Sequence, residues 1–239
     1  MPTCPQCGSS NVVKNGKTHN GKQNHKCYTC HRQFIEHPQP QTVSPPTIEI
    51  VDRLLLERIS LAGISRALRI SSKWLQNYIN HKYMWTAWIL EEEPENPGPI
   101  SLSILQCDEM CSFVGTKKNE QWIWLAMDTS TRKVVAAFVG DRSKKSAKNL
   151  WKLLPEAYRK QSIIYTDHWK SYRGVIPKKQ LRQVDKTTGQ TNMIERLNNT
   201  LRQRISRLVR RGLSFSKKLE NHIGAIFDFL HHYNASLSG

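Results

Sequence analysis

The chain has 239 residues, a length that accommodates two or three small domains, or one catalytic domain with appended modules. It contains 36 Lys and Arg residues against 19 Asp and Glu residues, which gives a formal net charge of +17. The excess is uneven, because residues 1–98 have a net charge of +3 and residues 99–239 have +14. A charge of this size favours a polyanionic partner, most commonly nucleic acid.

The amino terminus and the hydropathy of the chain argue against secretion and membrane insertion. The first ten residues, MPTCPQCGSS, lack the apolar stretch of a signal peptide, and the chain has no run of 18 apolar residues. Four of the six cysteines form two close pairs, which is typical of a metal site in a reducing compartment. The sequence therefore predicts a cytoplasmic protein with no membrane partner.

Two proline-rich segments divide the chain. They are EHPQPQTVSPP at 36–46 and EEEPENPGP at 91–99, and neither is compatible with regular helix or a central strand. The predicted architecture is a multidomain α/β protein. Its parts are a zinc ribbon at 1–36, a helix-turn-helix at 47–90 and a mixed sheet with flanking helices at 100–239.

The first part contains two CxxC pairs, Cys4 with Cys7 and Cys27 with Cys30, separated by nineteen residues. Two such turns supply the four-sulfur tetrahedral shell that zinc prefers. A 36-residue module cannot bury enough apolar surface by itself, so we expect one structural Zn²⁺ to hold it folded. The alternative is redox chemistry, which lacks the βαβ context that usually surrounds a redox CxxC motif.

The second part reads as three helices. Thr47 is the expected cap of the first, GISRALRI forms the second, and Ser71 caps the third. The apolar spacing matches a helix-turn-helix core, although Arg69 stands where the turn usually has Gly. The side chains that then face a DNA major groove are those of Ser72, Lys73, Gln76 and Asn77. The alternative is a three-helix bundle with no role in reading DNA, and we expect Trp74, Tyr78, Trp85 and Trp88 to pack rather than stack on bases.

From residue 100 the pattern changes to strands. Segments 100–115, 121–128 and 132–140 predict three antiparallel strands, and 146–154 predicts an amphipathic helix. The short apolar segment 162–167 predicts a buried parallel strand, and 190–211 predicts a long basic helix. This order of elements is that of an RNase H-like fold.

Three carboxylates occupy positions that such a fold brings together: Asp108 within the first strand, Asp167 at the end of the fourth and Glu195 in the first turns of the basic helix. Crowded carboxylates repel unless they share cations. Two Mg²⁺ or Mn²⁺ ions, with Asp108 bridging both, would neutralise this repulsion and suit in-line attack on a phosphodiester. The alternative is that a strand-end acid is an ordinary turn or cap residue, which fits Asp108 less well because it interrupts an apolar strand with no turn nearby. Glu109 points to the opposite face by strand alternation, so we do not expect it to bind metal.

Three segments resemble the catalytic part of the transposases of insertion sequence one. They are LQCDEMCSFVG with its following strand, IIYTDHWKSY, and TNMIERLNNTLRQRISRLVRRGLSFSKKLENHIGAIFDFLHHYN. The amino-terminal half looks like the DNA-binding portion of that family, so the resemblance covers nearly the whole chain. It implies that Asp108, Asp167 and Glu195 are the catalytic Asp–Asp–Glu set. It also implies binding to terminal inverted repeats, nicking at the 3′ end, strand transfer and a bacterial, nucleoid-associated setting.

The basic helix predicts contacts to the DNA backbone. Between Arg196 and Lys218 the chain has eight Lys or Arg residues and no acid. Such a run is often only a solvated face, but here it follows a candidate metal ligand, so it can hold DNA beside the scissile phosphate. The predicted contacts are Arg196, Arg202, Arg204, Arg207, Arg210 and Arg211.

The expected partners are double-stranded DNA, both transposon ends and target, and further copies of this chain in a dimer or higher oligomer. Two other functions remain open. One is a regulator that binds DNA without catalysis, and the other is a nuclease of the same fold that cuts DNA without joining it.

Overall fold

A computed structural model describes residues 2–19, 21–36, 42–90, 103–208 and 215–237 of the 239-residue chain. The chain divides into two units, Met1–Ser44 and Pro45–Gly239. The predicted linker 91–99 and the end of the predicted basic helix, with Arg210 and Arg211, lie outside the described residues.

The smaller unit is a three-stranded antiparallel sheet. Its strands are β1 (Val12–Lys17), β2 (Gln23–Cys27) and β3 (Gln33–Ile35), in that order across the sheet. Its core is small, with Cys4, Val12 and Cys27 buried and Phe34 packed beside them. So few buried apolar side chains cannot hold a unit of this size together without a crosslink or a metal.

The larger unit begins with three helices, α1 (Pro45–Leu55), α2 (Leu61–Leu68) and α3 (Ser72–Trp85). Ser71 caps α3 by accepting a hydrogen bond from the N–H of Trp74, as the sequence predicts. Arg69 adopts the left-handed conformation (φ 53°) that ends α2, so an arginine occupies the turn position where Gly is usual. Thr47 lies within the first turn of α1 rather than at its cap, because the helix begins two residues earlier at Pro45.

The mixed sheet has the order β6-β5-β4-β7-β8. The strands are β4 (Ile104–Phe113), β5 (Glu120–Asp128), β6 (Val134–Gly140), β7 (Ile163–Thr166) and β8 (Leu181–Gln183). The first three are antiparallel neighbours, and β7 pairs in parallel with β4. This confirms the predicted strand directions. The edge strand β8, parallel to β7, was not predicted because its three residues are too few for a periodic signal.

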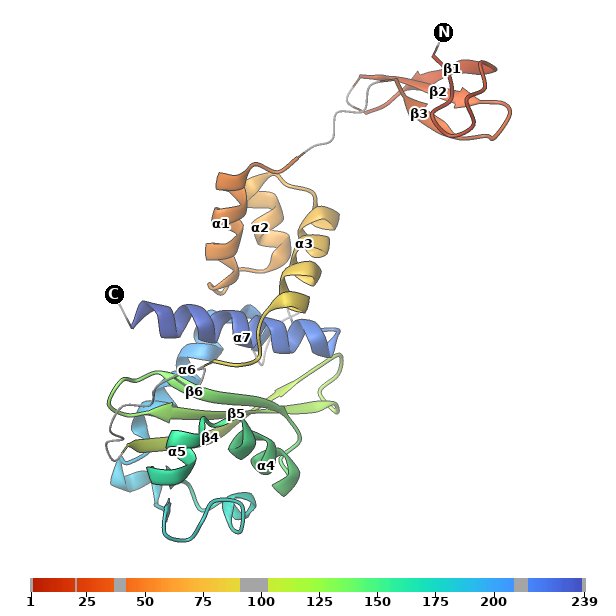
Figure 1. The fold of residues 1–239 in the computed structure, drawn as a ribbon. Coiled ribbons are helices and arrows are strands. Elements are labelled where there is room, and N and C mark those ends of the chain that lie inside the picture. The colour runs from red at the N-terminus through yellow and green to blue at the C-terminus, as the bar shows by residue number, and fades with distance from the viewer. Residues whose placement is uncertain (1, 20, 37–41, 91–102, 209–214, 238–239) are drawn as a thin grey trace. The chain divides into compact units, whose positions relative to one another are not determined.

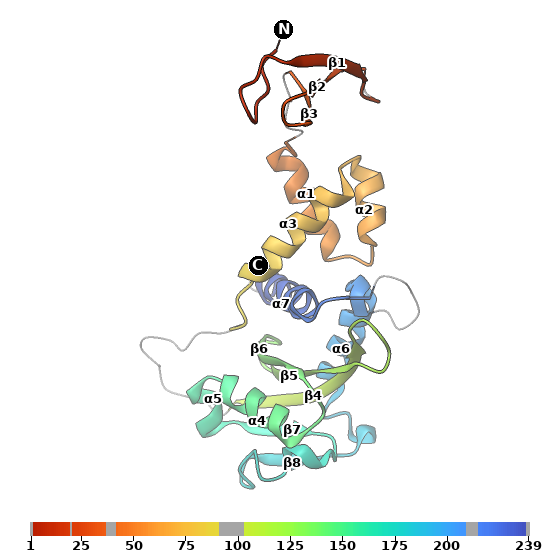
Figure 2. The ribbon, with the colours of Figure 1, turned by 90° about the vertical axis from the view of Figure 1, so that its right-hand side faces the viewer.

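Helices cover both faces of this sheet (Figures 1 and 2). On one face, α4 (Lys144–Leu153) packs over a core that includes Leu105, Trp124 and Ile164. The short α5 (Glu156–Gln161) follows α4 and leads into β7. On the other face, α6 (Asn192–Arg204) and α7 (Leu219–Ser236) pack over a core that includes Met110 and Leu125. Strand alternation therefore gives β4 one face toward α4 and the other toward α6.

Helix α7 lies between the three-helix bundle and the sheet (Figures 1 and 2). Its nine residues from His222 to Leu230 are all buried, because α3 covers one side and β6 the other. A Cβ atom on Gly224 would lie 2.3 Å from the Cβ atom of Tyr83, so only glycine permits this approach of α3 and α7. The bundle and the sheet thus share one continuous core.

Two expectations about helices and aromatic residues are wrong. The predicted basic helix 190–211 ends at Arg204, because Ile205 leaves the helix to bury its side chain, and a single 3₁₀ turn, η3 (Ser206–Leu208), follows. Trp74 and Tyr78 pack against each other, whereas Trp85 and Trp88, which were also expected to pack, are 72% and 54% exposed. None of the described helices combines the length and apolar content that crossing a bilayer requires.

Candidate metal and catalytic sites

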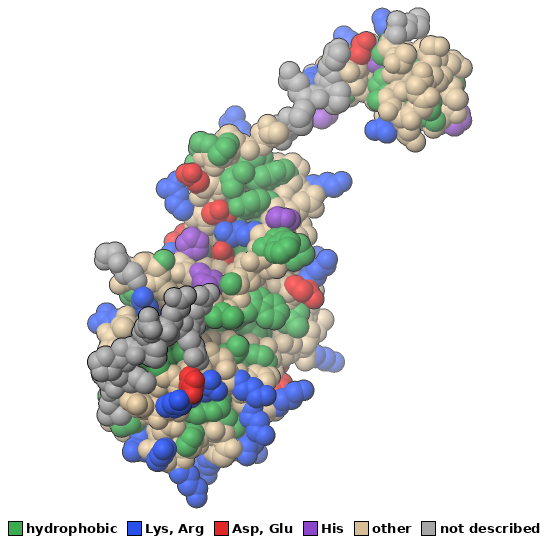
Figure 3. All heavy atoms as spheres, in the orientation of Figure 1, with side chains coloured by type: hydrophobic (Ala, Val, Ile, Leu, Met, Phe, Trp, Pro, Cys, Tyr) green, Lys and Arg blue, Asp and Glu red, His purple; other side chains and the backbone are tan. Residues whose placement is uncertain are grey.

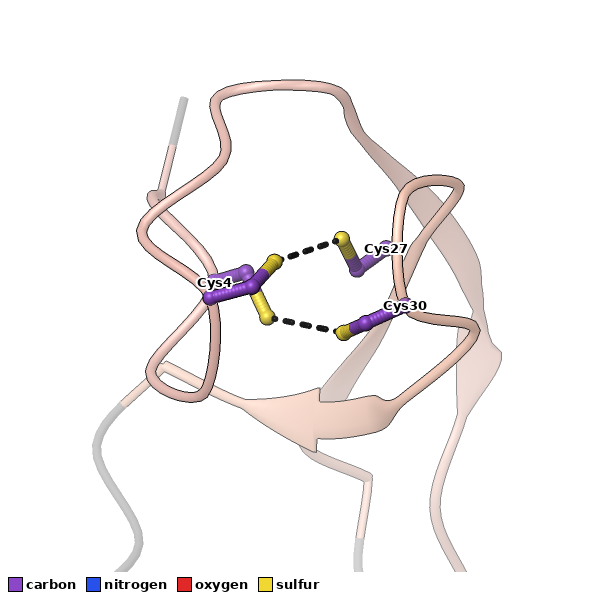
Figure 4. Close-up of side chains that lie close together, drawn as sticks. Cys4, Cys27 and Cys30 are labelled. Carbon is purple, nitrogen blue, oxygen red and sulfur yellow. Dashed lines mark hydrogen bonds between the residues drawn. The ribbon is translucent and has the colours of Figure 1, made fainter.

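The four cysteines of the CxxC pairs gather around one point in the smaller unit. Figure 4 shows the sulfur atoms of Cys4, Cys27 and Cys30 turned toward one another. The sulfur–sulfur distance is 3.5 Å from Cys4 to Cys30 and 3.6 Å from Cys7 to Cys27, and all four sulfurs lie within 4.8 Å of one another. Sulfur ligands about 2.3 Å from a tetrahedral zinc ion are separated by about 3.8 Å. The four sulfurs therefore have the spacing of a single zinc site.

The turn after Cys27 prepares its sulfur for metal binding. The backbone N–H of Cys30, followed by that of Thr29, donates to the Cys27 sulfur and lowers the pKa of this thiol to about 6. A thiolate is the form that binds zinc, so this turn favours the ligand state of Cys27. Paired N–H donors of this kind explain why the two-residue spacing matters. Against the backbone hydrogen bond from Ser9, burial and the neighbouring sulfurs raise the pKa of the Cys7 thiol.

Asp108 lies in the middle of β4 on the face that α6 covers. Its neighbours in sequence confirm the alternation, since Cys107 is buried in the core on the α4 side. The carboxylate of Asp108 is half-buried, and its Oδ2 atom accepts a hydrogen bond of 2.7 Å from the Nδ2 atom of Asn198. Asn198 lies on α6, so this contact ties the helix directly to the candidate catalytic strand.

Asp167 follows the last residue of β7, one strand away from Asp108. The parallel register pairs Gln106 with Tyr165, and Asp108 and Asp167 each lie two residues further along. Within β4 that shift preserves the face of Gln106, so Asp108 leaves the sheet on the α6 side. Asp167 lies one residue beyond the end of β7, so the register brings it next to the strand that carries Asp108. The carboxylate of Asp167 is half-buried, and its Oδ1 atom accepts the backbone N–H of Trp169 at 2.9 Å.

Glu195 lies in the first turn of α6, and β4 anchors this end of the helix. The side-chain oxygen of Gln106 accepts the backbone N–H of Ile194 at 3.0 Å, which fixes the helix start over the strand. The Oε1 atom of Glu195 accepts a hydrogen bond of 2.8 Å from the hydroxyl of Thr191. Glu195 lies three residues before Asn198, so both occupy the same side of α6. The sequence had given no reason to single out Gln106 or Asn198.

The three carboxylates do not form a single tight cluster. Within the described residues, the four cysteine sulfurs are the group of at least three potential ligand atoms that lie within 4.8 Å of one another, and Asp108, Asp167 and Glu195 do not meet that distance. A single ion would require such closeness. Two ions stand about 3.5–4 Å apart, so their outer ligands lie further from each other.

The carboxylate of Glu109 belongs to a different, buried network on the α4 side of the sheet. Arg142 donates to its Oε1 atom from Nη2 at 2.7 Å and from Nε at 3.0 Å, and the hydroxyl of Tyr172 donates to Oε2 at 3.0 Å. Burial raises the pKa of Glu109 to about 7 against the opposing hydrogen bond from Arg142, and repulsion from Asp167 and Asp108 adds to the increase. Strand alternation correctly predicts its face, but its partners are distant in sequence.

Two other acids have structural roles, as their positions beside turns indicate. Asp128 accepts hydrogen bonds from the backbone and hydroxyl of Ser130 and from the hydroxyl of Tyr158. Asp141 accepts from Ser143 and Ser146 at the start of α4, and these hydrogen bonds lower its pKa. Both therefore stabilise element ends.

The candidate DNA-reading residues of α3 lie on its exposed side. Lys73, Gln76 and Asn77 are all exposed, whereas Leu75 and Ile79 are buried against the other helices. The side-chain amide of Gln76 is already engaged within α3, because its Nε2 atom donates to the Oδ1 atom of Asn80 at 2.8 Å.

The arginines of the basic segment differ in what they contact. Arg196 is exposed, but Arg204 donates to Glu57 at 2.7 Å and lies over the ring of Phe229. Arg207 lies 5.7 Å from the centre of the Tyr83 ring and donates to the hydroxyl of Ser216. These two side chains therefore also hold the bundle, α7 and the carboxyl-terminal segment together. Figure 3 shows further Lys and Arg side chains gathered at the end of the larger unit farthest from α1.

Comparison with known proteins shows the family of this chain. Residues 102–234 match the family model described as IS1 transposase. The chain is 38% identical over 130 residues to the insertion element iso-IS1n protein InsB of Shigella dysenteriae, which covers 53% of this chain and 93% of that protein. It is 34% identical over 140 residues to the insertion element IS1 2 protein InsB of Escherichia coli K12, which covers 57% of this chain and 80% of that protein. The chain belongs to the IS1 transposase family.

Proposed function

We propose that this protein binds the terminal inverted repeats of its own insertion sequence, nicks DNA at the 3′ ends and joins those ends to target DNA. The catalytic residues in this proposal are Asp108, Asp167 and Glu195. The observation that supports it best is the register of β4 with β7, with Asp108 and Asp167 two residues beyond the pair Gln106 and Tyr165. The strand order β6-β5-β4-β7-β8, with helices on both faces, supports an RNase H-like fold.

The donor set fits hard divalent cations. Carboxylate oxygens are the ligands that Mg²⁺ and Mn²⁺ prefer, and three carboxylates suit two ions better than one. Asp108, Asp167 and Glu195 would hold these ions, which when bound neutralise charge on the phosphate and activate a water or a 3′-hydroxyl. Asn198 and Thr191 have the complementary task, because their hydrogen bonds orient the carboxylates of Asp108 and Glu195.

The DNA-binding part of the proposal rests on two modules. The four-cysteine site would hold one structural Zn²⁺ and keep the smaller unit folded as a zinc ribbon. The α2–α3 pair, with Ser71 capping α3 and Lys73, Gln76 and Asn77 exposed on it, would act as a helix-turn-helix whose second helix enters the major groove. Because one element has two ends, the protein would act on DNA as a dimer or higher oligomer.

The direct test is a cleavage and joining assay with the zinc-loaded full chain. The substrates are duplexes carrying the DNA that flanks its gene, a supercoiled target plasmid and Mg²⁺. The expected products are a nick at each 3′ end and covalent joining of that end to the plasmid. Nicking without joined product would support a nuclease instead. Specific binding to the ends without nicking in Mg²⁺ or Mn²⁺ would support a regulator.

A further inference from the structure

The larger unit contains a groove between the helix pair α2–α3 and the segment that leads into α7. Its volume is about 580 Å³, and the start of α2, the side of α3 and residues around η3 and the start of α7 line it. None of the proposed catalytic carboxylates lines this groove. The groove is therefore separate from the proposed catalytic site.

The charge of the lining is one-sided. Arg207, Lys217 and Lys218 contribute three cations, and no Asp or Glu is among the lining residues. Lys217 and Lys218 are exposed, so their ammonium groups are available to a ligand in solvent. A concave surface lined by one sign of charge concentrates ligands of the opposite sign.

Polar side chains in the lining of the groove are joined by hydrogen bonds. Two amides converge on the Oδ1 atom of Asn80, because Gln76 Nε2 donates to it at 2.8 Å and Asn221 Nδ2 at 2.9 Å. Asn221 belongs to α7, so these hydrogen bonds connect α3 to α7 within the lining of the groove. Lys82 of α3 strengthens the same junction by pairing with Asp228 of α7 at 3.1 Å.

Because these contacts hold α3 against α7, a ligand in the groove can contact both helices at once. Gln76 faces the groove and also lies on the exposed side of α3, beside Asn77. A duplex that contacts Gln76 is therefore next to the groove that the same side chain lines. Regularly spaced phosphates are the anions such a duplex offers, and Lys and Arg are their usual partners.

We propose that this groove is a phosphate-binding site for the DNA backbone, at which Lys217, Lys218 and Arg207 hold the duplex that α3 reads. The proposal rests on the proposed DNA-binding function and adds a definite site to it. It assigns a role in end binding to the carboxyl-terminal segment, next to the helix pair rather than beside the catalytic carboxylates.

The test compares Lys217→Gln/Lys218→Gln with Lys148→Gln/Lys152→Gln. The second variant loses the same charge from exposed lysines of α4, on the other face of the sheet. Affinity of the full chain for a random-sequence duplex is measured by fluorescence anisotropy between about 50 and 200 mM salt. The groove variant should bind about tenfold more weakly and show a salt slope smaller by about 1–2, because each lost phosphate contact lowers that slope by about 1. The α4 variant should stay close to the wild type.

Equal affinities and slopes for the two variants would overturn the proposal. A second arm uses inorganic phosphate: if it raises the melting temperature of the wild type but not of the groove variant, while both bind DNA equally, the site serves a free anion and the proposal also fails. Wild-type protein that binds no DNA at all would instead refute the proposed function, so the two failures are distinguishable.

Discussion

The carboxylate of Glu109 and the guanidinium of Arg142 form an ion pair in which the Glu109 side chain is fully buried. The guanidinium lies between two rings, 3.8 Å from the centre of Trp169 and 4.3 Å from that of Trp122. Trp169 also donates its backbone N–H to Asp167. The pair thus connects β4, next to Asp108, with the turn that positions Asp167.

Replacing Arg142 with Met should destabilise the protein and weaken binding of Mn²⁺. Removing one partner of a buried pair costs about 3–5 kcal/mol. Because Arg142 is 35% exposed, we expect a loss of about 2–3 kcal/mol, measured by urea unfolding. Arg173→Met, an exposed arginine in the same turn region, is the control. A change within about 0.5 kcal/mol for Arg142→Met would show that the pair is energetically unimportant.

Replacing Cys27 with Ser should remove zinc and unfold the smaller unit while leaving the larger one folded. The reason is that the core of Cys4, Val12 and Cys27 is too small to persist without the metal. Elemental analysis should give about one Zn²⁺ per wild-type chain and much less for the variant. Cys107→Ser, a buried cysteine in the sheet, should keep its zinc. Native protein that contains no zinc would refute the site.

Alanine at Asp108, Asp167 or Glu195 should abolish nicking and joining while leaving affinity for DNA nearly unchanged. These carboxylates would hold cations, and removing one lessens repulsion toward phosphate. Mg²⁺ and Mn²⁺ should support cleavage, whereas the larger Ca²⁺ should support binding with little chemistry. Asp185→Ala, an exposed acid after β8, is the control. Near-normal cleavage by Glu195→Ala would remove that residue from the site.

Alanine at Asn77 should reduce the preference for the specific ends over random DNA. Loss of a bidentate base contact costs about 1–3 kcal/mol of discrimination. Gln76→Ala should weaken discrimination less, because the Gln76 amide also donates to Asn80. Competition binding with end-sequence and random duplexes measures both. If Asn77→Ala lowers both affinities equally, this side of α3 contacts only the DNA backbone.

The free energy of unfolding should fall on acidification because His222 becomes protonated. His222 has an exposed fraction of 0%, and neither ring nitrogen has a hydrogen-bond partner among the described residues. Burial, followed by repulsion from Arg207, lowers the pKa of His222 to about 4. The unfolded chain therefore takes up the proton first, so stability that is present above about pH 6.5 is lost as the pH falls toward about 4.

The expected contribution is about 3 kcal/mol between neutral pH and about pH 4. Urea unfolding of the wild type and His222→Leu at pH 7.5 and 4.5 isolates it, because other groups titrate alike in both. The wild type should lose more stability than the variant over this range. Parallel losses would show that His222 does not titrate as its burial indicates.

The sequence by itself determined the features that depend on near neighbours. The two CxxC pairs predict the sulfur cluster because a tight turn brings two cysteines that are three positions apart to one side. Ser71 predicts the start of α3, and the short apolar segment 162–167 predicts β7 as a parallel strand. Strand alternation places Asp108 and Glu109 on opposite faces of β4.

Tertiary structure alone decided which distant surfaces meet. Helix α7 is buried along nine consecutive residues because bundle and sheet cover it from both sides, and no local pattern states that. The basic helix ends at Arg204 because the core takes the side chain of Ile205, although the charge pattern continues. The partners of Glu109 and of Arg204 lie 33 and 147 residues away. The periodicity of apolar residues in the sequence predicts which face of a helix or strand a side chain occupies. Which residue it contacts there depends on how the helices and strands pack.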